Sequence, residues 1–381
     1  MQKILHVVSV DFSLPIFVGE QFRYFKNKGY NLHVICSASA RLAPYAQKME
    51  FDYSVVEITR SFNFFKDLWA VYLICRYIHK NRIDIVVGHS PKGALLAMIA
   101  AFLMRVPKRI YFRHGLVYET FGGLKRKLLI NLDRITAFCA NQVVCVSPSV
   151  YDRSLIDRLN FASKQIILGK GTCNGIDALN KFNPSKIKLE AIDQLRLSLD
   201  IDPSSFVIGY CGRLVRDKGI VLLIEAFKMI RSEMNDSKIK LLIVGGFEER
   251  DALPTNIENE IKINPDISFT GFVFDNIENY YALMSVSVLP SYREGFPTTV
   301  LESSSMTLPV ITTKATGCID SIIDNETGIF IDNNASTLHK ALKFYYYNTE
   351  ERLLHGKNGR NFVLSQFTNQ IIWKEIEKIY V

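Results

Sequence analysis

The sequence has no hydrophobic run long enough to cross a bilayer. Its longest uncharged apolar stretch, residues 93–104, has twelve residues, whereas a membrane-spanning helix needs about 20. The amino-terminal residues already follow a strand pattern and offer no small-residue cleavage site, so we expect no secretory signal. With 21 glycines and 12 prolines, the chain is not of the collagen or linker type. These absences favour a folded cytosolic protein.

The cysteines lack the spacings of a disulfide framework or a zinc site. There are seven, none in a Cys-x-x-Cys pair, and Cys139 and Cys145 have no histidines at zinc-ligand spacing. An odd, dispersed set is typical of reduced core thiols in the cytosol. We therefore predict no metal site and no metal cofactor.

Charge of one sign is concentrated in the first half of the chain. Residues 1–190 carry 27 lysines and arginines against 13 acids, a balance of +14, whereas residues 191–381 carry 19 against 25, a balance of −6. The chain has none of the signatures of the common nucleic-acid-binding modules, so nucleic acid is not the expected partner. An anionic membrane, a phosphorylated substrate or a solvated basic face all fit the basic half.

With 381 residues the chain is too long for one ordinary domain. Short β-branched runs alternate with segments of helical period, which predicts parallel sheets with helices on both faces. The strands expected in the first half are residues 4–10, 31–37, 83–88, 109–113 and 142–146. Those expected in the second half are residues 206–211, 239–244, 267–270, 286–289, 309–313 and 328–331.

The expected helices complete an α/β pattern of two doubly wound domains. They are residues 18–28, 66–80, 91–104, 124–139, 219–231, 276–282, 298–306, 335–345, 349–367 and 370–380. We place the first domain at residues 1–180, a polar linker at 181–204 and the second domain at 205–367.

Polar and glycine residues follow nearly every expected strand. Ligands of open parallel sheets bind outside the carboxyl ends of the strands. In the first half these positions hold Asp11, His89-Ser90, His114-Gly115 and Ser147; in the second half they hold Gly212-Arg213, Gly245-Gly246, Gly271-Phe272 and residues 291–294. If the two edges face each other, they enclose one cleft between the domains.

The turn from Gly212 to Gly219 joins a strand to a helix and carries two cations. Arg213 and Lys218 lie five residues apart, so both can approach one polyanion near the helix start, where backbone N–H groups already favour negative charge. The spacing is neither a Walker loop nor Gly-x-Gly-x-x-Gly. A solvated basic turn paired through Asp217 is the alternative.

A second loop places two carboxylates around backbone amides. Glu294 precedes Gly295-Phe296-Pro297, Thr298 is the expected N-cap of the next helix, and Glu302 lies just inside that helix. Carboxylates bind sugar hydroxyls and amides at a helix start bind phosphate, so the loop suits a phosphorylated, polyhydroxylated ligand. Alternatively, Glu302 only stabilises the helix start.

Three other features are open to more than one interpretation. His114 ends a strand and is either structural or catalytic, whereas His6 and His89 are interpreted as structural. Lys125, Arg126 and Lys127 stand beside an apolar stripe and form either a membrane patch or an ordinary helix surface. Asp200-Ile201-Asp202 could hold a metal ion for a nucleotide sugar, but it lies away from any strand end and is interpreted as a turn.

Together these motifs resemble the retaining glycosyltransferases of the GT-B fold, in family four, which builds surface polysaccharides and glycolipids. Glu294 and Glu302 match the Glu-x7-Glu motif, and Gly212-Arg213-Leu214 with Lys218-Gly219 matches the Gly-Arg-Leu…Lys-Gly motif. Residues 174–177 look like the Asn-Gly-hydrophobic-Asp element before the interdomain linker. The resemblance covers essentially the whole chain, and it departs at residues 14–20, where Gly19 stands alone instead of a Gly-Gly pair.

The resemblance implies two Rossmann-like domains, with a carboxyl-terminal helix, residues 368–381, packing back on the first. It implies a metal-independent transferase that needs no cofactor and uses a nucleotide sugar, UDP being the favoured nucleotide. Arg213 and Lys218 would bind the diphosphate and Glu302 the ribose. Glu294 and the amides of residues 295–298 would bind the hexose and phosphate. Gly246 with Phe247, and residues 271–273 with Phe272 and Val273, would flank the base. His114 would approach the sugar from the acceptor side.

The run 113–120 is similar to the branch that acts on lipid-linked saccharides in bacterial capsule or O-antigen assembly. This implies a lipid-diphosphate-linked acceptor and a peripheral place at the inner face of the plasma membrane. Two alternatives stay open: a nucleotide-sugar 2-epimerase of the same fold, and a non-catalytic scaffold of a polysaccharide assembly complex.

Overall fold

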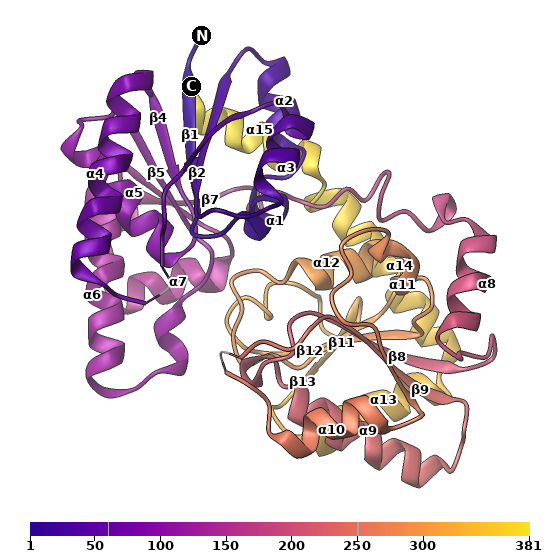
Figure 1. The fold of residues 1–381 in the computed structure, drawn as a ribbon. Helices are drawn as coiled ribbons and strands as arrows, with labels where there is room; N and C mark the ends of the chain where they lie inside the picture. Colours follow the sequence, from indigo (N-terminus) through magenta and orange to yellow (C-terminus); the bar gives the residue numbers. More distant parts are fainter. Residues whose placement is uncertain (60, 250) are drawn as a thin grey trace. The chain divides into compact units, whose positions relative to one another are not determined.

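The computed structural model describes residues 1–59, 61–249 and 251–381 (Figure 1). The chain divides into two compact units. Unit 1 comprises residues 1–175 and 370–381, and unit 2 comprises residues 176–369. Helix α8 (Leu189–Ser198), in the segment expected as a linker, belongs to unit 2.

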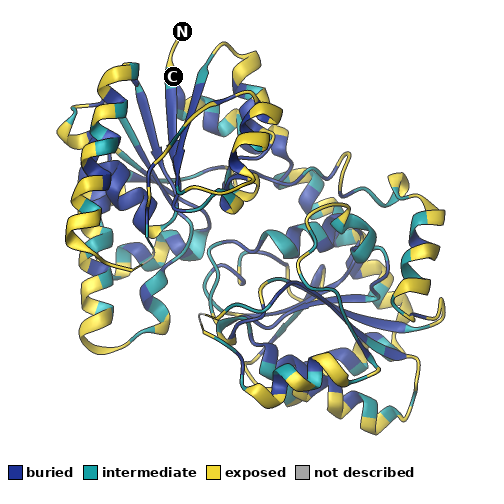
Figure 2. Cartoon of the chain, viewed as in Figure 1, coloured by how far each residue is buried: buried dark blue, intermediate teal, exposed yellow. Residues whose placement is uncertain are grey.

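Unit 1 is built on a seven-stranded parallel sheet in the order β3-β2-β1-β4-β5-β6-β7. Its strands are β1 (Lys3–Val7), β2 (Asn31–Cys36), β3 (Asp52–Val55), β4 (Ile85–Gly88), β5 (Lys108–Arg113), β6 (Gln142–Cys145) and β7 (Gln165–Ile167). The central strands are buried along nearly their whole length, because helices cover both faces of the sheet (Figure 2).

Three long helices of unit 1 pack side by side: α4 (Phe64–Asn81), α5 (Pro91–Leu103) and α6 (Gly123–Cys139). The middle helix α5 is almost entirely buried, in keeping with its run of alanine, leucine and isoleucine. The remaining elements are α1 (Leu14–Phe17), α2 (Gln21–Asn27), α3 (Leu42–Met49), α7 (Pro148–Ile156), α15 (Asn369–Tyr380), η1 (Asp11–Ser13), η2 (Val117–Thr120) and η3 (Ala162–Lys164).

The carboxyl-terminal helix α15 packs on α2 within unit 1. The Tyr24 hydroxyl donates to Glu377 Oε2 at 3.0 Å, and the Phe25 and Tyr380 ring centres lie 4.9 Å apart. Ile372, Ile376 and Tyr380 are fully buried. The last twelve residues therefore complete the core of the unit that begins the chain.

Unit 2 is built on a six-stranded parallel sheet in the order β10-β9-β8-β11-β12-β13. Its strands are β8 (Phe206–Cys211), β9 (Ile239–Val244), β10 (Ile267–Phe269), β11 (Val286–Leu289), β12 (Val310–Thr313) and β13 (Gly328–Ile331). Besides α8, its helices are α9 (Ile220–Met234), α10 (Thr255–Ile263), α11 (Ile277–Tyr281), α12 (Thr298–Ser305), α13 (Ala335–Tyr347), α14 (Thr349–Gln366), η4 (Pro184–Lys186) and η5 (Arg216–Lys218).

The expected elements correspond to the observed ones with few corrections. Strand β1 ends at Val7, not Val10, because the chain turns into η1 at Asp11. Strands β3 and β7 and helices α3, α7 and α10 were not predicted. Both strands are short and lie at the edges of the sheet, where one side lacks a partner and the hydrophobic pattern is weak.

Candidate active site

The strand order reverses once in each sheet, and the two predicted donor motifs flank the reversal in unit 2. In unit 2 the reversal lies between β8 and β11, and in unit 1 between β1 and β4. A crevice opens at such a switch point, beyond the carboxyl ends of the strands. The turn 212–219 follows β8, the loop 290–297 follows β11, and His89 follows β4.

In unit 2, the turn and the loop are tied together by close backbone contacts. Gly219 has φ of +72°, and a Cβ there would stand 2.0 Å from the Pro290 carbonyl oxygen, so only glycine fits. Asp217 Oδ2 accepts from Arg293 Nη2 at 3.0 Å, and the Asp217 carbonyl accepts from the Tyr292 N–H at 2.9 Å. Asp217 therefore joins the two motifs. In the described part of the chain it pairs with Arg293, whereas Lys218 pairs with Glu294.

Each predicted phosphate-binding cation faces a carboxylate. Lys218 Nζ forms an ion pair with Glu294 Oε1, and both side chains are largely buried. Arg213 Nη1 contacts Glu248 Oε2 at 2.9 Å and is more exposed. Glu248 was not predicted. It could have been found in the sequence as an acidic residue close to the end of β9, two positions after Gly246. The structure thus brings Lys218 to Glu294 and gives Arg213 a different acid.

The loop from Glu294 to α12 corrects one prediction. Helix α12 begins at Thr298, with Pro297 as the preceding residue and no side-chain cap, so Thr298 is not the N-cap. Pro297 has no N–H, which leaves the amides of Gly295, Phe296 and Thr298 as possible donors. The Phe296 side chain is buried, with its ring 5.2 Å from that of Phe367, so only its backbone can face a ligand.

Glu302, in the second turn of α12, is held by a buried tyrosine. The Tyr281 hydroxyl donates to Glu302 Oε2 at 2.7 Å. Burial raises the pKa of Glu302, and the hydrogen bond from Tyr281 opposes that rise. The residue as a whole is half-buried.

Further backbone contacts join the glycine-rich strand ends of unit 2. The Leu214 N–H donates to the Gly246 carbonyl, and the Gly245 N–H donates to the Gly271 carbonyl, both at 2.9 Å. Phe272 covers Gly246 so closely that a Cβ at Gly246 would lie 2.2 Å from its ring. Phe272 and Phe274 are exposed, their rings are nearly parallel and 6.2 Å apart, and Val273 between them is half-buried.

In unit 1, the structure joins the three histidines that the sequence left separate. His114 Nε2 lies 2.9 Å from His89 Nδ1, and His89 Nε2 lies 3.1 Å from His6 Nδ1. His6 and His89 are buried, and His114 is half-buried. Burial lowers the pKa of His6 and of His114 to about 3. The interpretation of His6 and His89 as structural residues did not include their contact with His114.

An aromatic ring covers His114 from the segment where the expected glycine pair is missing. The Phe17 ring stacks on His114 with a centroid distance of 3.8 Å and also faces His89 at 5.8 Å. Phe112 lies against His89 at 5.1 Å. These rings hold the imidazoles in fixed planes.

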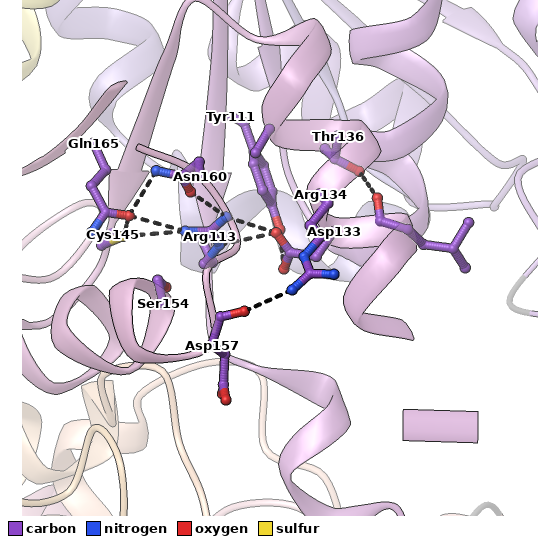
Figure 3. Close-up of polar contacts among 12 residues, drawn as sticks. Tyr111, Arg113, Asp133, Arg134, Thr136, Cys145, Ser154, Asp157, Asn160 and Gln165 are labelled. Atoms are coloured by element: carbon purple, nitrogen blue, oxygen red, sulfur yellow. Dashed lines mark hydrogen bonds and ion pairs between the residues drawn. The ribbon is translucent and has the colours of Figure 1, made fainter. Parts of the chain in front are cut away.

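A buried arginine anchors the strand end that carries His114. The Arg113 guanidinium is fully buried and donates to Asp133 Oδ1 at 2.7 Å, to Asn160 Oδ1 at 2.9 Å and to Gln165 Oε1 at 3.3 Å (Figure 3). These partners come from α6, from the loop after α7 and from β7. Asp133 raises the pKa of Arg113 against the opposing effect of burial.

The predicted basic triplet on α6 is not uniform. Lys125 and Lys127 are exposed, and Lys125 Nζ lies 3.8 Å from the centre of the Phe121 ring. Arg126 instead turns inward, where it contacts Asp157 Oδ1 at 3.4 Å and the Tyr118 ring. Consecutive helix residues point in different directions, so three adjacent cations cannot share one face.

Sequence reasoning also missed a set of exposed apolar side chains in unit 1. On α4 and the residues before it, Phe65 is 81% and Trp69 61% exposed, and on α6 Leu124 is 84% exposed. We call this group the apolar rim of unit 1; its members are Phe62, Phe64, Phe65, Leu68, Trp69, Tyr72, Leu124 and Leu128. The high density of aromatic residues in 62–72 could have indicated this surface from the sequence.

Neither a metal cluster nor a membrane span is evident in the part of the chain that the structure describes. Its residues include no group of three His, Cys, Asp or Glu side chains arranged to hold a metal ion. Among the described helices, none combines the length and the hydropathy that crossing a membrane requires.

Comparisons with known protein families agree with the order of the two units. Residues 16–167 match the model of the family described as Glycosyltransferase Family 4, and residues 192–362 match that of Glycosyl transferases group 1. The two matches together include every predicted donor-site residue.

Relatives and solved structures align over nearly the whole chain. The Staphylococcus aureus protein CapM, a capsular polysaccharide biosynthesis glycosyltransferase, is 33% identical over 100% of this chain and 97% of its own. An Escherichia coli UDP-Gal:alpha-D-GlcNAc-diphosphoundecaprenol alpha-1,3-galactosyltransferase is 27% identical over 94% of this chain and 90% of its own. The Anabaena protein HepE in complex with UDP-glucose superimposes with a TM-score of 0.82 over 100% of both chains, at 17% identity, which shows a shared fold.

Proposed function

The chain belongs to family four of the GT-B glycosyltransferases, and we propose that it moves a hexose or N-acetylhexosamine, with retention, from a UDP-sugar to a saccharide on a lipid diphosphate during surface polysaccharide synthesis. The observation that carries this proposal is the buried Lys218–Glu294 pair at the switch point of unit 2. Relatives named for a UDP-sugar donor and an undecaprenyl-diphosphate acceptor support the choice of substrates.

The donor diphosphate would compete with protein carboxylates for the two cations. On binding, it would draw Lys218 from Glu294 and Arg213 from Glu248. Glu294 would then be free to accept hydrogen bonds from the hexose hydroxyls. Glu302 would hold the ribose, while Phe272 and Phe274 offer flat apolar rings to the uracil.

In the proposed reaction, the bond between the anomeric carbon and the diphosphate oxygen breaks. The acceptor oxygen bonds to the same face of that carbon, and its proton passes to the departing diphosphate. Charge therefore accumulates on the diphosphate, and fixed cations lower the barrier by stabilising it. Lys218 and Arg213 supply that stabilisation without a metal ion. His114, from unit 1, would contact a sugar hydroxyl as a neutral ring.

We further propose that unit 1 rests on an anionic membrane, where a lipid-linked acceptor resides. Exposed Lys125 and Lys127 would attract anionic headgroups, and the apolar rim would enter the interface. Trp69 and Tyr72 are of the residue types that are enriched at the boundary between lipid headgroups and acyl chains. The enzyme would then be a peripheral protein of the cytoplasmic face.

A mass-spectrometric screen tests the reaction directly. Purified protein is incubated with a panel of nucleotide sugars, with and without lipid-diphosphate saccharides, and the product anomer is assigned by NMR. We expect transfer with retention for one UDP-sugar. The Lys218→Met variant should lose roughly tenfold or more in kcat/KM. Lys228→Met, which removes a solvent-exposed lysine of α9, should match the wild type.

Other outcomes would contradict the proposal. Conversion of the donor into a second nucleotide sugar, without an acceptor, would indicate an epimerase. Neither transfer nor donor hydrolysis across the panel would indicate a scaffold. Transfer with inversion would leave the family unchanged but would exclude the retaining mechanism.

A further inference from the structure

The three histidines of unit 1 form a continuous row of edge-to-edge rings. The ring centres of His6 and His89 lie 5.3 Å apart and those of His89 and His114 5.2 Å apart, with interplanar angles of 16° and 32°. Because the facing nitrogens are only 3.1 and 2.9 Å apart, the rings meet through nitrogen atoms and not through their faces. The row extends from inside β1, past the end of β4, to the end of β5.

Each of the two contacts requires one proton, and each neutral imidazole carries one. If the His89 proton is on Nε2, it donates to His6 Nδ1 and must accept from His114 Nε2. If it is on Nδ1, it donates to His114 Nε2 and must accept from His6 Nδ1. In the first state all three rings are protonated on Nε2, and in the second all three are protonated on Nδ1.

Burial favours the neutral form of all three rings, because it lowers the pKa of each. Burial lowers the pKa of His89 well below its ordinary value, and His114 and His6 lower it further. Among the residues that the structure describes, no acid is hydrogen-bonded or ion-paired to any of the three. A charged middle ring, which would break the coupling, is therefore disfavoured.

We propose that His6, acting through His89, sets the tautomer of His114, so that the three rings switch together between the two states. His6 and His89 are then positioning residues, and the state of the row decides whether Nδ1 of His114 donates or accepts a hydrogen bond. Among the described residues, the hydrogen bonds of His114 involve Nε2 only, which leaves Nδ1 for a ligand.

The functional consequence rests on the proposed glycosyl transfer. A sugar hydroxyl that donates its proton to Nδ1 selects the Nε2-protonated state, and one that accepts selects the other. The buried ring of His6 would thereby influence which hydroxyl orientation His114 can bind. The coupling itself is a property of the protein alone and can be measured without substrate.

Long-range ¹⁵N–¹H NMR of histidine-labelled full-length protein tests the coupling, since the ring nitrogen shifts report the tautomer. The chain has seven histidines, and single His→Phe variants assign them. We expect His6, His89 and His114 to show equal ratios of the two tautomers in the wild type. Unequal ratios, or a charged ring at pH 7, would overturn the proposal without any variant.

Variants then test the direction of the coupling. In His6→Phe we expect the tautomer ratio of His114 to change by roughly two- to tenfold, the range that one hydrogen bond is worth. In a His89→Phe background, adding His6→Phe should cause no further change at His114. The matched control is His33→Phe on the neighbouring strand β2, because His33 is also buried but bonds to Tyr77 at 3.0 Å.

Activity measurements separate this proposal from the proposed function. If the tautomer ratio of His114 is unchanged in a folded His6→Phe variant, the coupling is refuted even if the protein is an active transferase. If no transfer is found while the NMR ratios change as expected, the coupling holds and the proposed function fails. If the coupling and the transferase activity are both found, His6→Phe should lower kcat in proportion to the loss of the His114 tautomer that binds the sugar hydroxyl. Donor KM should stay unchanged.

Discussion

At the scale of single residues, buried polar partners determine which charges remain available. Tyr281 donates to one oxygen of Glu302, and Asp217 forms an ion pair with Arg293. Asp133 neutralises Arg113 inside unit 1. A charged group without such a partner would be expensive at these positions.

We predict that Glu302→Ala raises donor KM more than it lowers kcat. The proposed ribose bonds are far from the reacting carbon, so they should be similar in the ground and transition states. The binding free energy of the donor should weaken by about 1.5–3 kcal/mol, which is the contribution of a hydrogen bond to a charged group. Calorimetry of UDP binding checks this, and unchanged affinity in a folded variant would refute the ribose assignment.

Glu302→Gln tests how the ionisation of Glu302 affects the stability of the protein. Because burial raises the pKa of Glu302, ionisation opposes folding, and wild-type stability falls as pH rises from the ordinary glutamate range through the raised pKa. Glutamine keeps the shape and does not ionise. Its thermal midpoint should exceed that of the wild type at pH 7, and the difference should close below about pH 4.

The second residue-scale prediction concerns Asp133. Removing it by Asp133→Ala leaves the Arg113 guanidinium buried without its carboxylate (Figure 3). We expect a loss of about 3–5 kcal/mol in the free energy of unfolding, measured by denaturant titration. Asp152→Ala, at an exposed position on α7, should be within about 0.5 kcal/mol of the wild type. Equal stability of the two variants would show that the network is not a stabilising anchor.

At the scale of elements, α4 and α6 present apolar and basic side chains to solvent instead of the usual polar face. The same α6 that supplies Asp133 to the core exposes Leu124, Lys125, Lys127 and Leu128. Ile135 and Phe138 nearer its carboxyl end are exposed as well. A helix that exposes both apolar and basic side chains is suited to a membrane interface.

We predict that Lys125→Ser with Lys127→Ser weakens binding to anionic vesicles. Each exposed cation contributes about 1 kcal/mol near such a surface, so two should lower binding by about 2 kcal/mol, roughly thirtyfold. Binding should also fall as salt rises. Co-sedimentation measures both effects, and Lys186→Ser with Lys188→Ser in unit 2 is the charge-matched control.

Substitutions in the apolar rim test membrane binding independently of charge. Phe64→Ser with Phe65→Ser should reduce binding to anionic and neutral vesicles alike, because it acts through apolar area and not charge. If both double variants pellet like the wild type, the membrane surface lies elsewhere and the transferase assignment is unaffected.

At the scale of the whole molecule, the chain leaves unit 1 after residue 175 and returns to it at residue 370. The last helix therefore makes the stability of the first unit depend on the end of the chain. We predict that ending the chain at Thr368 destabilises unit 1 by several kcal/mol, because Ile372, Ile376 and Tyr380 leave the core.

Hydrogen exchange followed by mass spectrometry measures this loss in each unit. Protection should fall in β1 and α2 and persist in β8 and β9. If the truncated chain does not fold, Ile376→Ala tests the same contact and should cost about 2–5 kcal/mol. Equal loss in both units would show that the two sheets unfold as one.

We also predict that the complete enzyme keeps its activity in excess EDTA. The proposed mechanism assigns the diphosphate charge to Arg213 and Lys218, each of which already lies beside a displaceable carboxylate. Initial rates before and after EDTA treatment test this. Loss of activity that Mg²⁺ or Mn²⁺ restores would show that a metal takes part in the reaction.

The fold class and the placement of the donor motifs after strands follow from local patterns in the sequence. The alternation of buried strands and amphipathic helices is a local pattern, so strands such as β8, β9 and β11 could be predicted to the residue. The turn 212–219 and the loop 290–297 could be placed at one edge of the sheet, because each follows a strand and the ends of parallel strands meet there. The binding roles of their residues stay predictions.

Which side chains meet depends on how the helices and strands pack together. Adjacent cations such as Lys125 and Arg126 look equivalent in the sequence, yet helix geometry exposes one and turns the other to Asp157. The histidine row depends on the strand order β1-β4-β5, in which His6 pairs with Val87 across the switch point. The contact between His6 and His89 joins residues 83 positions apart. It follows from strand order and register, which no local pattern encodes.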